Sequence, residues 1–410
     1  MKLLLYSWQA NNEQILADNL TELGYEVVWF RKECKHYTRD MELAMEMIPY
    51  IHREGIKAVV SFNYFPIISA ICDTSKIPYY AWVYDCPHFT LYAGQVTLPC
   101  NHIGIFDKEM VRELEAYGVR TVSHVPLSVD ADLFEEAVNR ASEQEKEKYR
   151  CDISFVGSLY TDEHNYYDRF FAETADMTKH KEMSGETGTN PDTLAAVIQK
   201  QCFAYEKDYL REAEAAGEID IAPVKDWMEK QGLLLGTDYF AKPEDVLLAT
   251  VLEKKVTVEE RRLLLSEIAT GFGERYRFCL YTASDLSKLP VLRKYHKGIV
   301  DYQQQMPLVF TGSKINMNLS LRSIHSGIPL RVLDIMACGG FVLTNFQTEI
   351  AEYFREGEEI ATFRSLEECM EKLRYYLQNN AEREAVAAAG HRKVRETFSY
   401  RNGLEKLFGI

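Results

Sequence analysis

The chain has 410 residues, of which 46% are hydrophobic and 27% are charged, and its formal net charge is -15. This length and balance are typical of a globular protein with two to three domains. The negative charge argues against a nucleic acid or an anionic membrane surface as the partner, because either would require a basic patch.

The start of the chain and its cysteines indicate the cellular compartment of the protein. The apolar run in Met1–Trp8 is too short for a signal peptide, and no segment approaches the length of a membrane span, so we expect a cytoplasmic protein. The nine cysteines form no Cys-x-x-Cys pair. We therefore expect reduced thiols rather than disulfides or a zinc site.

Short apolar runs alternate with helical periods in the first part of the chain. The expected strands are 3–6, 27–30, 58–62, 79–83, 102–106 and 122–125, and the expected helices are 13–23, 41–54, 66–73 and 108–117. This alternation predicts a doubly wound parallel sheet, with ligands beyond the carboxyl ends of its strands. The polar strand tips are Ser7–Gln9, Asn63–Tyr64, Asp85–His88 and Asp107.

The middle of the chain interrupts this pattern. Residues 135–150 are charged and lack a clear core face, which indicates a solvated connector. A strand at 151–156 then opens a second sheet and ends in a turn at Gly157 and Ser158, whose amides could face a phosphate. A lone Gly-Ser turn is weak evidence, but its place after the first strand of a second domain strengthens it.

Residues 160–271 are polar and rich in helical periods, which predicts a helical subdomain inserted into the second domain. Its clearest helices are 193–216, 243–252 and 258–270, and residues 184–191 are expected to form a loop. The second sheet resumes with strands at 276–281, 298–302 and 315–319, and helices follow at 366–379 and 382–397.

The most informative stretch runs from Ser326 to Asn345. Gly327 and Pro329 precede an apolar helix, the pair Gly339–Gly340 suits a left-handed helix end, and residues 341–343 form a short apolar strand. Arg331 and Asp334 are three residues apart, so they share one face of the helix near its positive end. An anion and a ribose could both be held there.

This stretch closely resembles the donor-binding helix of GT-B glycosyltransferases. The motif Pro-Leu-x-x-(Glu/Asp)-x-(Met/Leu)-Ala-Cys-Gly is matched at Pro329, Leu330, Asp334, Met336, Ala337, Cys338 and Gly339. The wider context, from Lys314 to Thr344, is similar to the bacterial spore-maturation-protein branch of these proteins. The segments Trp82–Pro87 and His124–Phe134 also resemble passages of the first GT-B domain.

The resemblance implies two Rossmann-like domains of α/β class facing a cleft. The first would span residues 1–134 and bind the acceptor, and the second would span 151–399 and bind the donor, with 135–150 as connector and a helical insertion at about 160–270. The resemblance also implies that the tail, 400–410, crosses back and packs on the first domain. Many retaining GT-B enzymes place a Glu eight residues before the ribose-binding carboxylate, and Ser326 stands there, which slightly favours inversion and leaves the stereochemistry open.

The implied donor is a nucleotide-diphosphate sugar, bound without a metal or another cofactor. The residues expected to contact it are Gly157, Ser158, Lys314, Arg322, His325, Ser326, Gly327, Arg331 and Asp334. Arg331 opposes the helix dipole, so a phosphate role is favoured over an ion pair with Asp334 or a solvated side chain. Asp334 could bind ribose hydroxyls or be a surface carboxylate. A lone histidine such as His325 is more often structural.

Deprotonation of an acceptor hydroxyl requires a base. Asp85 is the preferred candidate and His88 the second, since both follow a strand end that faces the expected cleft. The competing interpretation is a turn, because Asp-x-Pro favours turns and Asp85 could simply accept hydrogen bonds from nearby amides. A metal held by this pair would lack further ligands at a recognisable spacing, so no metal site is expected.

The leading hypothesis is a glycosyltransferase whose acceptor is a cell-surface or spore-coat glycan or another hydroxyl compound. One alternative is a protein that binds nucleotide sugars or glycans without catalysis during assembly of a surface layer. Another is a nucleotide-sugar epimerase, which uses the same architecture. Donor consumption without any acceptor would identify the epimerase.

Overall fold

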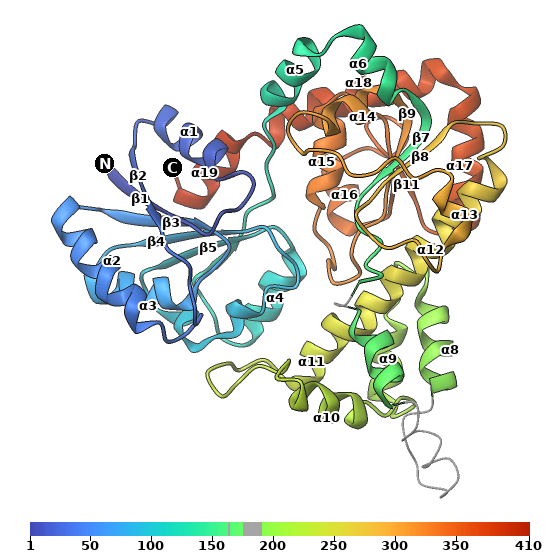
Figure 1. The fold of residues 1–410 in the computed structure, drawn as a ribbon. Coiled ribbons are helices and arrows are strands. Elements are labelled where there is room, and N and C mark those ends of the chain that lie inside the picture. The colour runs from blue at the N-terminus through green and yellow to red at the C-terminus, as the bar shows by residue number, and fades with distance from the viewer. Residues whose placement is uncertain (163–164, 175–190) are drawn as a thin grey trace, which may run out of the picture.

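The computed structural model describes residues 1–162, 165–174 and 191–410, which form two lobes (Figure 1). The first lobe contains a six-stranded sheet in the order β2-β1-β3-β4-β5-β6, and the second contains a five-stranded sheet in the order β11-β10-β9-β7-β8. All pairings within both sheets are parallel. The prediction of two Rossmann-like sheets is therefore confirmed.

The first lobe follows the alternation expected from its sequence. Its strands are β1 (Lys2–Ser7), β2 (Glu26–Arg31), β3 (Ala58–Phe62), β4 (Tyr79–Val83), β5 (Asn101–Ile105) and β6 (Val122–His124). Its helices are α1 (Glu13–Glu22), α2 (Met41–Glu54), α3 (Pro66–Ser75) and α4 (Lys108–Ala116), with short 3-10 turns η1 (Phe89–Tyr92) and η2 (Gly94–Thr97). Successive side chains of β1 enter opposite cores, because a strand alternates its faces: Leu3 and Leu5 belong to one cluster, Leu4 and Tyr6 to the other.

Two helices connect the lobes, α5 (Ala131–Arg140) and α6 (Glu143–Tyr149). Residues 135–150 are mostly exposed, as a solvated connector would be, but they do have a core face: Ala137 and Tyr149 are buried, and both helices contact α14 of the second lobe. Phe134, Ala137, Val138 and Ala141 supply an apolar stripe at helical spacing, and this stripe packs on the second lobe.

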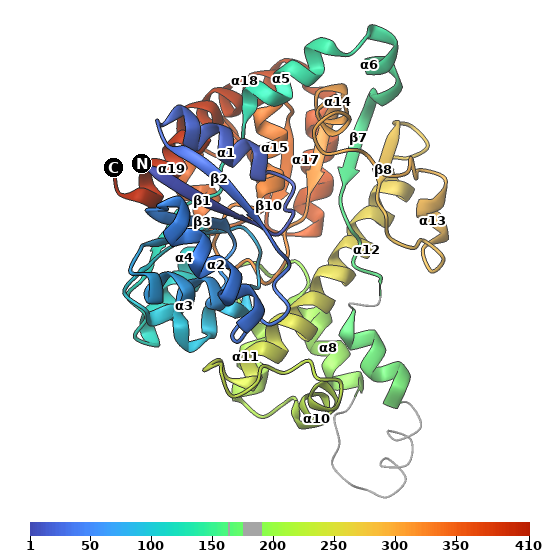
Figure 2. The same ribbon diagram turned by 60° about the vertical axis from the view of Figure 1, so that its left-hand side comes forward.

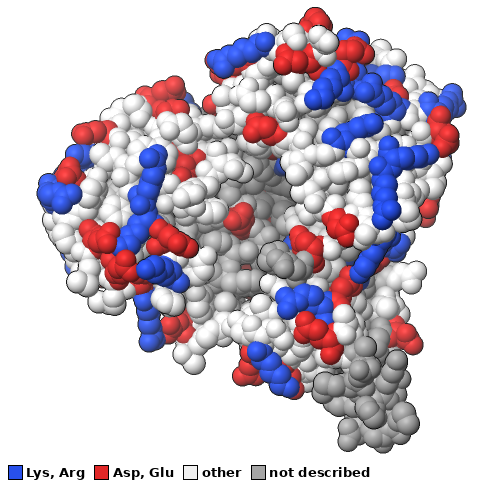
Figure 3. Space-filling view, in the orientation of Figure 1, with Lys and Arg blue, Asp and Glu red and all other residues white. Residues whose placement is uncertain are grey.

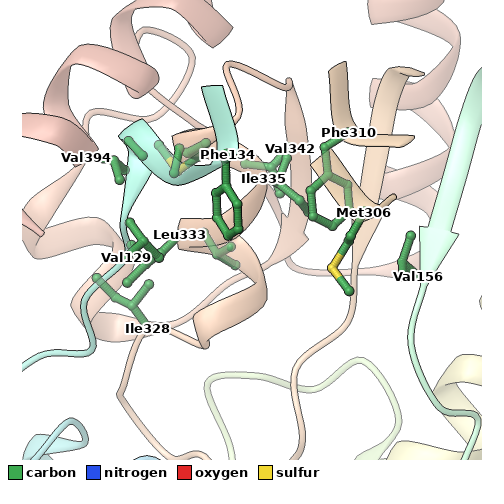
Figure 4. Close-up of a cluster of buried hydrophobic side chains, with 14 of the residues drawn as sticks. Val129, Phe134, Val156, Met306, Phe310, Ile328, Leu333, Ile335, Val342 and Val394 are labelled. Atoms are coloured by element: carbon green, nitrogen blue, oxygen red, sulfur yellow. The ribbon is translucent and has the colours of Figure 1, made fainter. Parts of the chain in front are cut away.

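The second lobe has helices on both faces of its sheet. Its strands are β7 (Cys151–Val156), β8 (Phe278–Tyr281), β9 (Ser313–Asn318), β10 (Val342–Asn345) and β11 (Ala361–Phe363). Its helices after the insertion are α13 (Pro290–Arg293), α14 (Met306–Gly312), α15 (Leu330–Ala337), α16 (Thr348–Tyr353), α17 (Leu366–Gln378) and α18 (Asn380–Thr397). Figure 4 shows the core on one face, where Phe134 of α5 lies among Phe310, Leu333, Ile335 and Val342.

The insertion is helical, as expected, and its last helix also belongs to the second lobe. It contains a helical stretch at 166–174, then α8 (Pro191–Gln201), α9 (Tyr209–Ala215), α10 (Ala222–Lys230), α11 (Pro243–Leu247), a π-helical turn η3 (Leu248–Leu252) and α12 (Glu253–Gly271). Leu264, Leu265 and Ile268 of α12 pack in the core of the second sheet. None of the described helices is both long and apolar enough to cross a bilayer.

Two expected elements differ in the structure. Residues 298–302 form no strand: Gly298 has a φ of +88°, Ile299 is 72% exposed, and Asp301 instead accepts hydrogen bonds from the amides of Gln303 and Gln304 in a turn. The helix expected at 193–216 is broken at 202–208, because the Gln201 side chain binds the amide of Tyr209 and the carbonyls of Ala204 and Lys207. The loop expected at 184–191 lies, up to residue 190, outside the described residues.

The chain crosses between the lobes twice, at neighbouring places. The amide of Val129 donates to the carbonyl of Phe398 at 2.9 Å, so the outgoing and returning segments lie side by side. The returning segment leads into α19 (Tyr400–Phe408), which contacts α1, β4 and β5 of the first lobe. Both ends of the chain therefore lie on the first lobe, close together in both views (Figures 1 and 2).

Candidate functional site

The carboxyl ends of β3 and β4 place Asp85 at the edge of the first sheet. Its Oδ2 accepts a hydrogen bond of 2.7 Å from Nδ2 of Asn63, and Oδ1 of the same asparagine accepts from the amides of Tyr84 and Asp85. Asp85 is exposed, and within the described chain its Oδ1 has no hydrogen-bond partner. One carboxylate oxygen is thus held by the protein while the other is open to a ligand.

His88, the second candidate base, is committed to the protein. Its Nε2 accepts from the amide of Tyr64 at 3.1 Å and lies 2.7 Å from Oγ1 of Thr90. Burial lowers the pKa of His88, although the carbonyl of Tyr64 and the charge of Asp85 act in the opposite direction. The ring therefore orders the loop after β4, and Asp85 is the better placed of the two.

The second lobe meets the first beside Asp85. The thiol of Cys86 donates to the carbonyl of Ser323 at 2.8 Å, which joins the loop after β4 to the loop after β9. Figure 3 shows a hollow between the two lobes. The loops at the carboxyl ends of both sheets therefore meet at this hollow. Ligands of parallel α/β proteins bind outside these strand ends.

The amides around Gly327 do hold an anion, but it is a carboxylate of the first lobe. Asp107, buried at the N-terminus of α4, accepts from the amides of His325 at 2.7 Å, Ser326 at 3.1 Å and Gly327 at 3.3 Å. The hydroxyl of Ser326 lies between Asp107 and Glu349, at 2.8 Å from an oxygen of each. His325, Ser326 and Gly327 thus form a contact between the lobes.

His325 also carries a charge in this contact. Burial alone would lower its pKa, but the ion pair with Glu253, at 3.1 Å, and the charge of Asp107 raise it to about 9. The imidazole is therefore protonated at neutral pH. Glu253 begins α12, so this ion pair joins the loop after β9 to the insertion.

Arg331 and Asp334 pair near the start of α15, so the ion pair that the sequence left as the less favoured alternative is present. Nη1 of Arg331 lies 3.1 Å from Oδ2 of Asp334, and the hydroxyl of Tyr302 donates to Oδ1 at 2.8 Å. Asp334 is 1% exposed, and this burial raises its pKa to about 6 against the effect of Arg331. A ribose hydroxyl could bind Asp334 only by displacing one of these partners, whereas Arg331 is partly exposed.

The turn after β7 is bound by a residue of α12 that the sequence did not single out. The guanidinium of Arg261, on α12, donates to the carbonyls of Ser158 and Leu319, at the carboxyl ends of β7 and β9. Arg261 is 7% exposed, its Nε has no acceptor, and no carboxylate of the described chain is within ion-pair distance. The amide of Gly157 donates to Tyr281, so in this turn the cation rather than that amide is available to an anion.

Two more cations act on Arg261: Lys254, which shares the ring of Tyr160 with it, and Arg331, which acts through its charge. Burial lowers the pKa of Arg261, and the charge of Arg331 lowers it further. Burial also lowers the pKa of Lys254, against the charge of Asp162 and with a smaller contribution from Arg261. Nζ of Lys254 is 3.7 Å from the centre of the Tyr160 ring, and Cζ of Arg261 is 4.8 Å from it. Arg261, Arg331 and Lys254 form what we call the cation cluster.

Two predicted donor residues lie outside this cluster. Arg322 forms a salt bridge of 2.6 Å with the buried carboxylate of Glu260 and donates to the carbonyls of Gln201 and Ala204, so it joins the insertion to the sheet. Lys314 begins β9 and pairs with Asp152, near the start of β7, at 2.7 Å. It therefore lies at the opposite end of the sheet from the cation cluster.

Sequence signals existed for some of the missed residues. Arg261 falls on the same helical stripe as Val258, Leu264, Leu265 and Ile268, and an arginine among core positions is unusual enough to note. Asp107 and Asn63 were visible as polar strand tips, without any sign of their partners. Among the described residues, no group of three or more His, Cys, Asp or Glu side chains is arranged to hold a metal ion.

Comparisons with known proteins concern the sequence of the second lobe and the fold of the whole chain. Residues 261–409 match the family described as glycosyl transferase-like. An uncharacterized protein of Aquifex aeolicus (strain VF5) is 26% identical over 119 residues, which is 28% of this chain and 30% of that relative. The match thus spans less than a third of the relative's length.

Solved structures resemble the whole chain in fold. A glycosyltransferase from Rickettsia africae has a TM-score of 0.58 at 10% identity, covering 100% of this chain and 97% of its own. Anabaena HepE in complex with UDP-glucose has a TM-score of 0.54 at 6% identity, covering 100% and 98%. WaaG, a glycosyltransferase involved in lipopolysaccharide biosynthesis, has a TM-score of 0.50 at 10% identity, covering 100% and 99%. This chain therefore has the GT-B fold, and its residues 261–409 are similar to the glycosyl transferase-like family.

Proposed function

We propose that this chain is a glycosyltransferase. The second lobe would bind a nucleotide-diphosphate sugar, and the first would bind an acceptor with a reactive hydroxyl. The observation that carries the proposal is the buried Arg261 at the carboxyl ends of β7 and β9, which has an unused donor and, among the described residues, no carboxylate within ion-pair distance. A buried cation without a neutralising anion is costly, and a bound diphosphate would compensate its charge.

The chemistry divides between the lobes. When the bond between the sugar and the diphosphate breaks, negative charge grows on the diphosphate, and Arg261, Arg331 and Lys254 would stabilise it. Asp334 orients Arg331 through their ion pair. Across the hollow, the open Oδ1 of Asp85 would accept the proton of the acceptor hydroxyl, while Asn63 holds the other oxygen.

Two finer points belong to this proposal. HepE, which shares the fold, has been solved with UDP-glucose, so uridine nucleotides are the first donors to test. The similarity of residues 314–344 to spore-maturation proteins favours a cell-surface or spore-coat glycan as the acceptor. The reaction would not depend on a metal ion, because the cation cluster would supply the charge that a metal otherwise provides.

The first experiment measures donor binding. The nucleoside diphosphates of uridine, guanosine, adenosine, cytidine and thymidine, and UDP-glucose, are added to the wild type, Arg331→Ala and the control Arg140→Ala. Arg140 pairs with Glu136 on the exposed side of α5. A ligand bound only to the folded state stabilises it by about 2.7 kcal/mol at a hundredfold excess over its dissociation constant. We expect a thermal shift for one nucleotide, kept in Arg140→Ala and lost in Arg331→Ala.

The second experiment separates catalysis from binding. Asp85→Asn keeps a side chain that can still pair with Asn63 but removes the base, so we expect nucleotide release with an acceptor to fall about 10²–10⁴-fold while donor binding persists. Asp73→Asn, on α3 of the same lobe, is the control. Binding without turnover in the wild type would favour the non-catalytic alternative, and an isomerised donor without free nucleotide would favour the epimerase. Absence of any nucleotide shift would contradict the proposal.

A further inference from the structure

A cavity of about 710 Å³ lies at the carboxyl edge of the first sheet and is lined by both lobes. Trp8 follows β1, Asn63 follows β3 and Asp85 follows β4, and these three side chains come from the first lobe. Leu235 and Tyr239 line it from the insertion, which belongs to the second lobe. The candidate base is therefore part of a cavity that the first lobe does not complete by itself.

Residues 233–241, which we call the insertion arm, reach this cavity by pairing with the first lobe. The arm lies between α10 and α11 and extends toward the first lobe in Figure 1. The amide of Phe240 donates to the carbonyl of Tyr92 at 2.9 Å, and the amide of Gly94 donates to the carbonyl of Asp238 at 3.3 Å. Tyr239 forms an antiparallel bridge with Ala93. Backbone pairing thus sets the position of the arm.

Side chains fix the same contact. Asp238 forms a salt bridge with Arg39 at 2.5 Å and accepts from the hydroxyl of Thr38 at 3.0 Å. The ring of Phe240 lies against Tyr92 and Tyr117, with centroids 5.7 Å and 5.3 Å away. Polar and aromatic contacts on both sides of Tyr239 therefore place that residue at the cavity.

The cavity combines aromatic faces with polar groups. Trp8 is 39% exposed, and its Nε1 donates to the carbonyl of Phe62 at 2.9 Å, which holds the indole in place. Tyr37 is 52% exposed at the same cavity. Exposed aromatic rings beside the open carboxylate oxygen of Asp85 suit a sugar, whose apolar ring face stacks and whose hydroxyls form hydrogen bonds.

We propose that the insertion arm and the strand ends of the first lobe together form the acceptor site, and that the acceptor is a carbohydrate whose ring stacks on Trp8. This inference rests on the proposed function. The acceptor oxygen attacks the anomeric carbon of the donor sugar, the bond from that carbon to the diphosphate oxygen breaks with its electron pair going to the diphosphate, and the acceptor proton passes to Asp85. The arm then determines which acceptors enter, although it belongs to the donor lobe.

The test measures the binding of 4-nitrophenyl glycosides of glucose, galactose, mannose, N-acetylglucosamine and N-acetylgalactosamine by calorimetry. Nucleotide binding is measured on the same samples, and circular dichroism checks folding. We expect at least one glycoside to bind the wild type, and about tenfold or greater weakening in both Trp8→Ala and Tyr239→Ala, because aromatic anchors dominate such contacts. Asp226→Asn, an exposed position on α10, should bind like the wild type.

A further variant tests the arm without changing the cavity wall. Asp238→Ala removes the contacts with Arg39 and Thr38, and we expect weaker glycoside binding with unchanged nucleotide binding. Glycosides that bind equally to wild type, Trp8→Ala and Tyr239→Ala, or no glycoside binding to a wild type that binds nucleotide, would overturn the inference. A wild type that binds no nucleotide would instead contradict the proposed function, so the two failures are distinguishable.

Discussion

At the scale of residues, the contact between the lobes depends on ionised groups with little exposure. Asp107 accepts hydrogen bonds from the amides of residues 109, 110, 325, 326 and 327 and from the hydroxyl of Ser326. Hydrogen bonds to a carboxylate are stronger than those between neutral groups. The loop expected to cradle a phosphate is therefore held in place by the other lobe.

The pKa of His325 gives this contact a dependence on pH. In the folded protein the pKa is about 9, above the ordinary value of 6.5, so the ion pair with Glu253 contributes fully below about pH 6.5 and is lost as the pH rises through 9. Asp107 and Arg211 also face the imidazole and act on its charge. We expect the unfolding temperature of the wild type to fall more steeply between pH 6.5 and 9 than that of His325→Gln.

The measurement is thermal unfolding followed by circular dichroism across that range of pH. Glu253→Gln serves as the matched variant, because it removes the partner but keeps the histidine, and its curve should resemble that of His325→Gln. Parallel curves for the wild type and both variants would show that His325 titrates at the same pH in the folded and unfolded chain.

The candidate site residues that the sequence singled out are those with local signals, and their roles stay predictions. Arg331 and Asp334 were found by their spacing within one helix turn, and Asp85 by its place after a strand. Asp107 and Arg261 could not be assigned, because their partners lie far along the chain: residues 325–327 for Asp107, and Ser158 and Leu319 for Arg261. Only the folded sheet order brings these groups together.

At the scale of elements, the end of α15 shows why two glycines follow one another. Gly339 has a φ of +75°, in the left-handed region expected for the end of the helix. Gly340 is required for a different reason: a Cβ there would lie 2.8 Å from Nδ2 of Asn316 and 2.8 Å from the carbonyl of Phe310. The close approach lets α15 pack near β9 and α14.

Replacement of Gly340 should therefore destabilise the second lobe. We expect Gly340→Ala to lower the free energy of unfolding by about 1–3 kcal/mol, the range for overpacking in a well-packed core. Guanidinium unfolding followed by circular dichroism measures the change. Gly94→Ala is the control, since no atom lies within 4 Å of the added methyl group, and equal stability of the two variants would contradict this account.

Elements with a strong hydrophobic periodicity were predicted within a few residues. Elements whose structure depends on tertiary contacts were not. Ala58–Phe62 and Tyr79–Val83 are strands at the predicted bounds. Residues 298–302 have a similar apolar content, and the segment begins beside β8, where the carbonyl of Gly298 accepts from the amide of Thr282 at 3.0 Å. The φ of +88° at Gly298 then departs from strand geometry, so the backbone at this glycine, rather than the local composition, decides that segment.

At the scale of the whole molecule, α19 completes the first lobe. Tyr400, Leu404 and Leu407 are at most 5% exposed and share a core cluster with Trp82 and Val125. A Cβ at Gly403 would lie 2.1 Å from the Trp82 ring, so the helix backbone rests directly on that indole.

Deletion of residues 400–410 should destabilise the first lobe more than the second. Each buried side chain of this size contributes about 1.5–3 kcal/mol, and the deletion exposes Trp82 as well. We expect faster hydrogen exchange at the amides of β1 and β4, with β9 and β10 unchanged. Deletion of Gly409 and Ile410 alone is the control, because Ile410 is 70% exposed, and equal exchange in both truncated chains would contradict the role of α19.

The return of the chain to its first lobe also sets an order of assembly during synthesis. Domains generally fold as units while the ribosome is still translating. Here the strands of the first sheet emerge early, yet the face around Trp82 is uncovered until residues 400–408 are translated, after the entire second lobe. We therefore expect the first lobe to reach its full stability only after the second lobe and α19 have been synthesised.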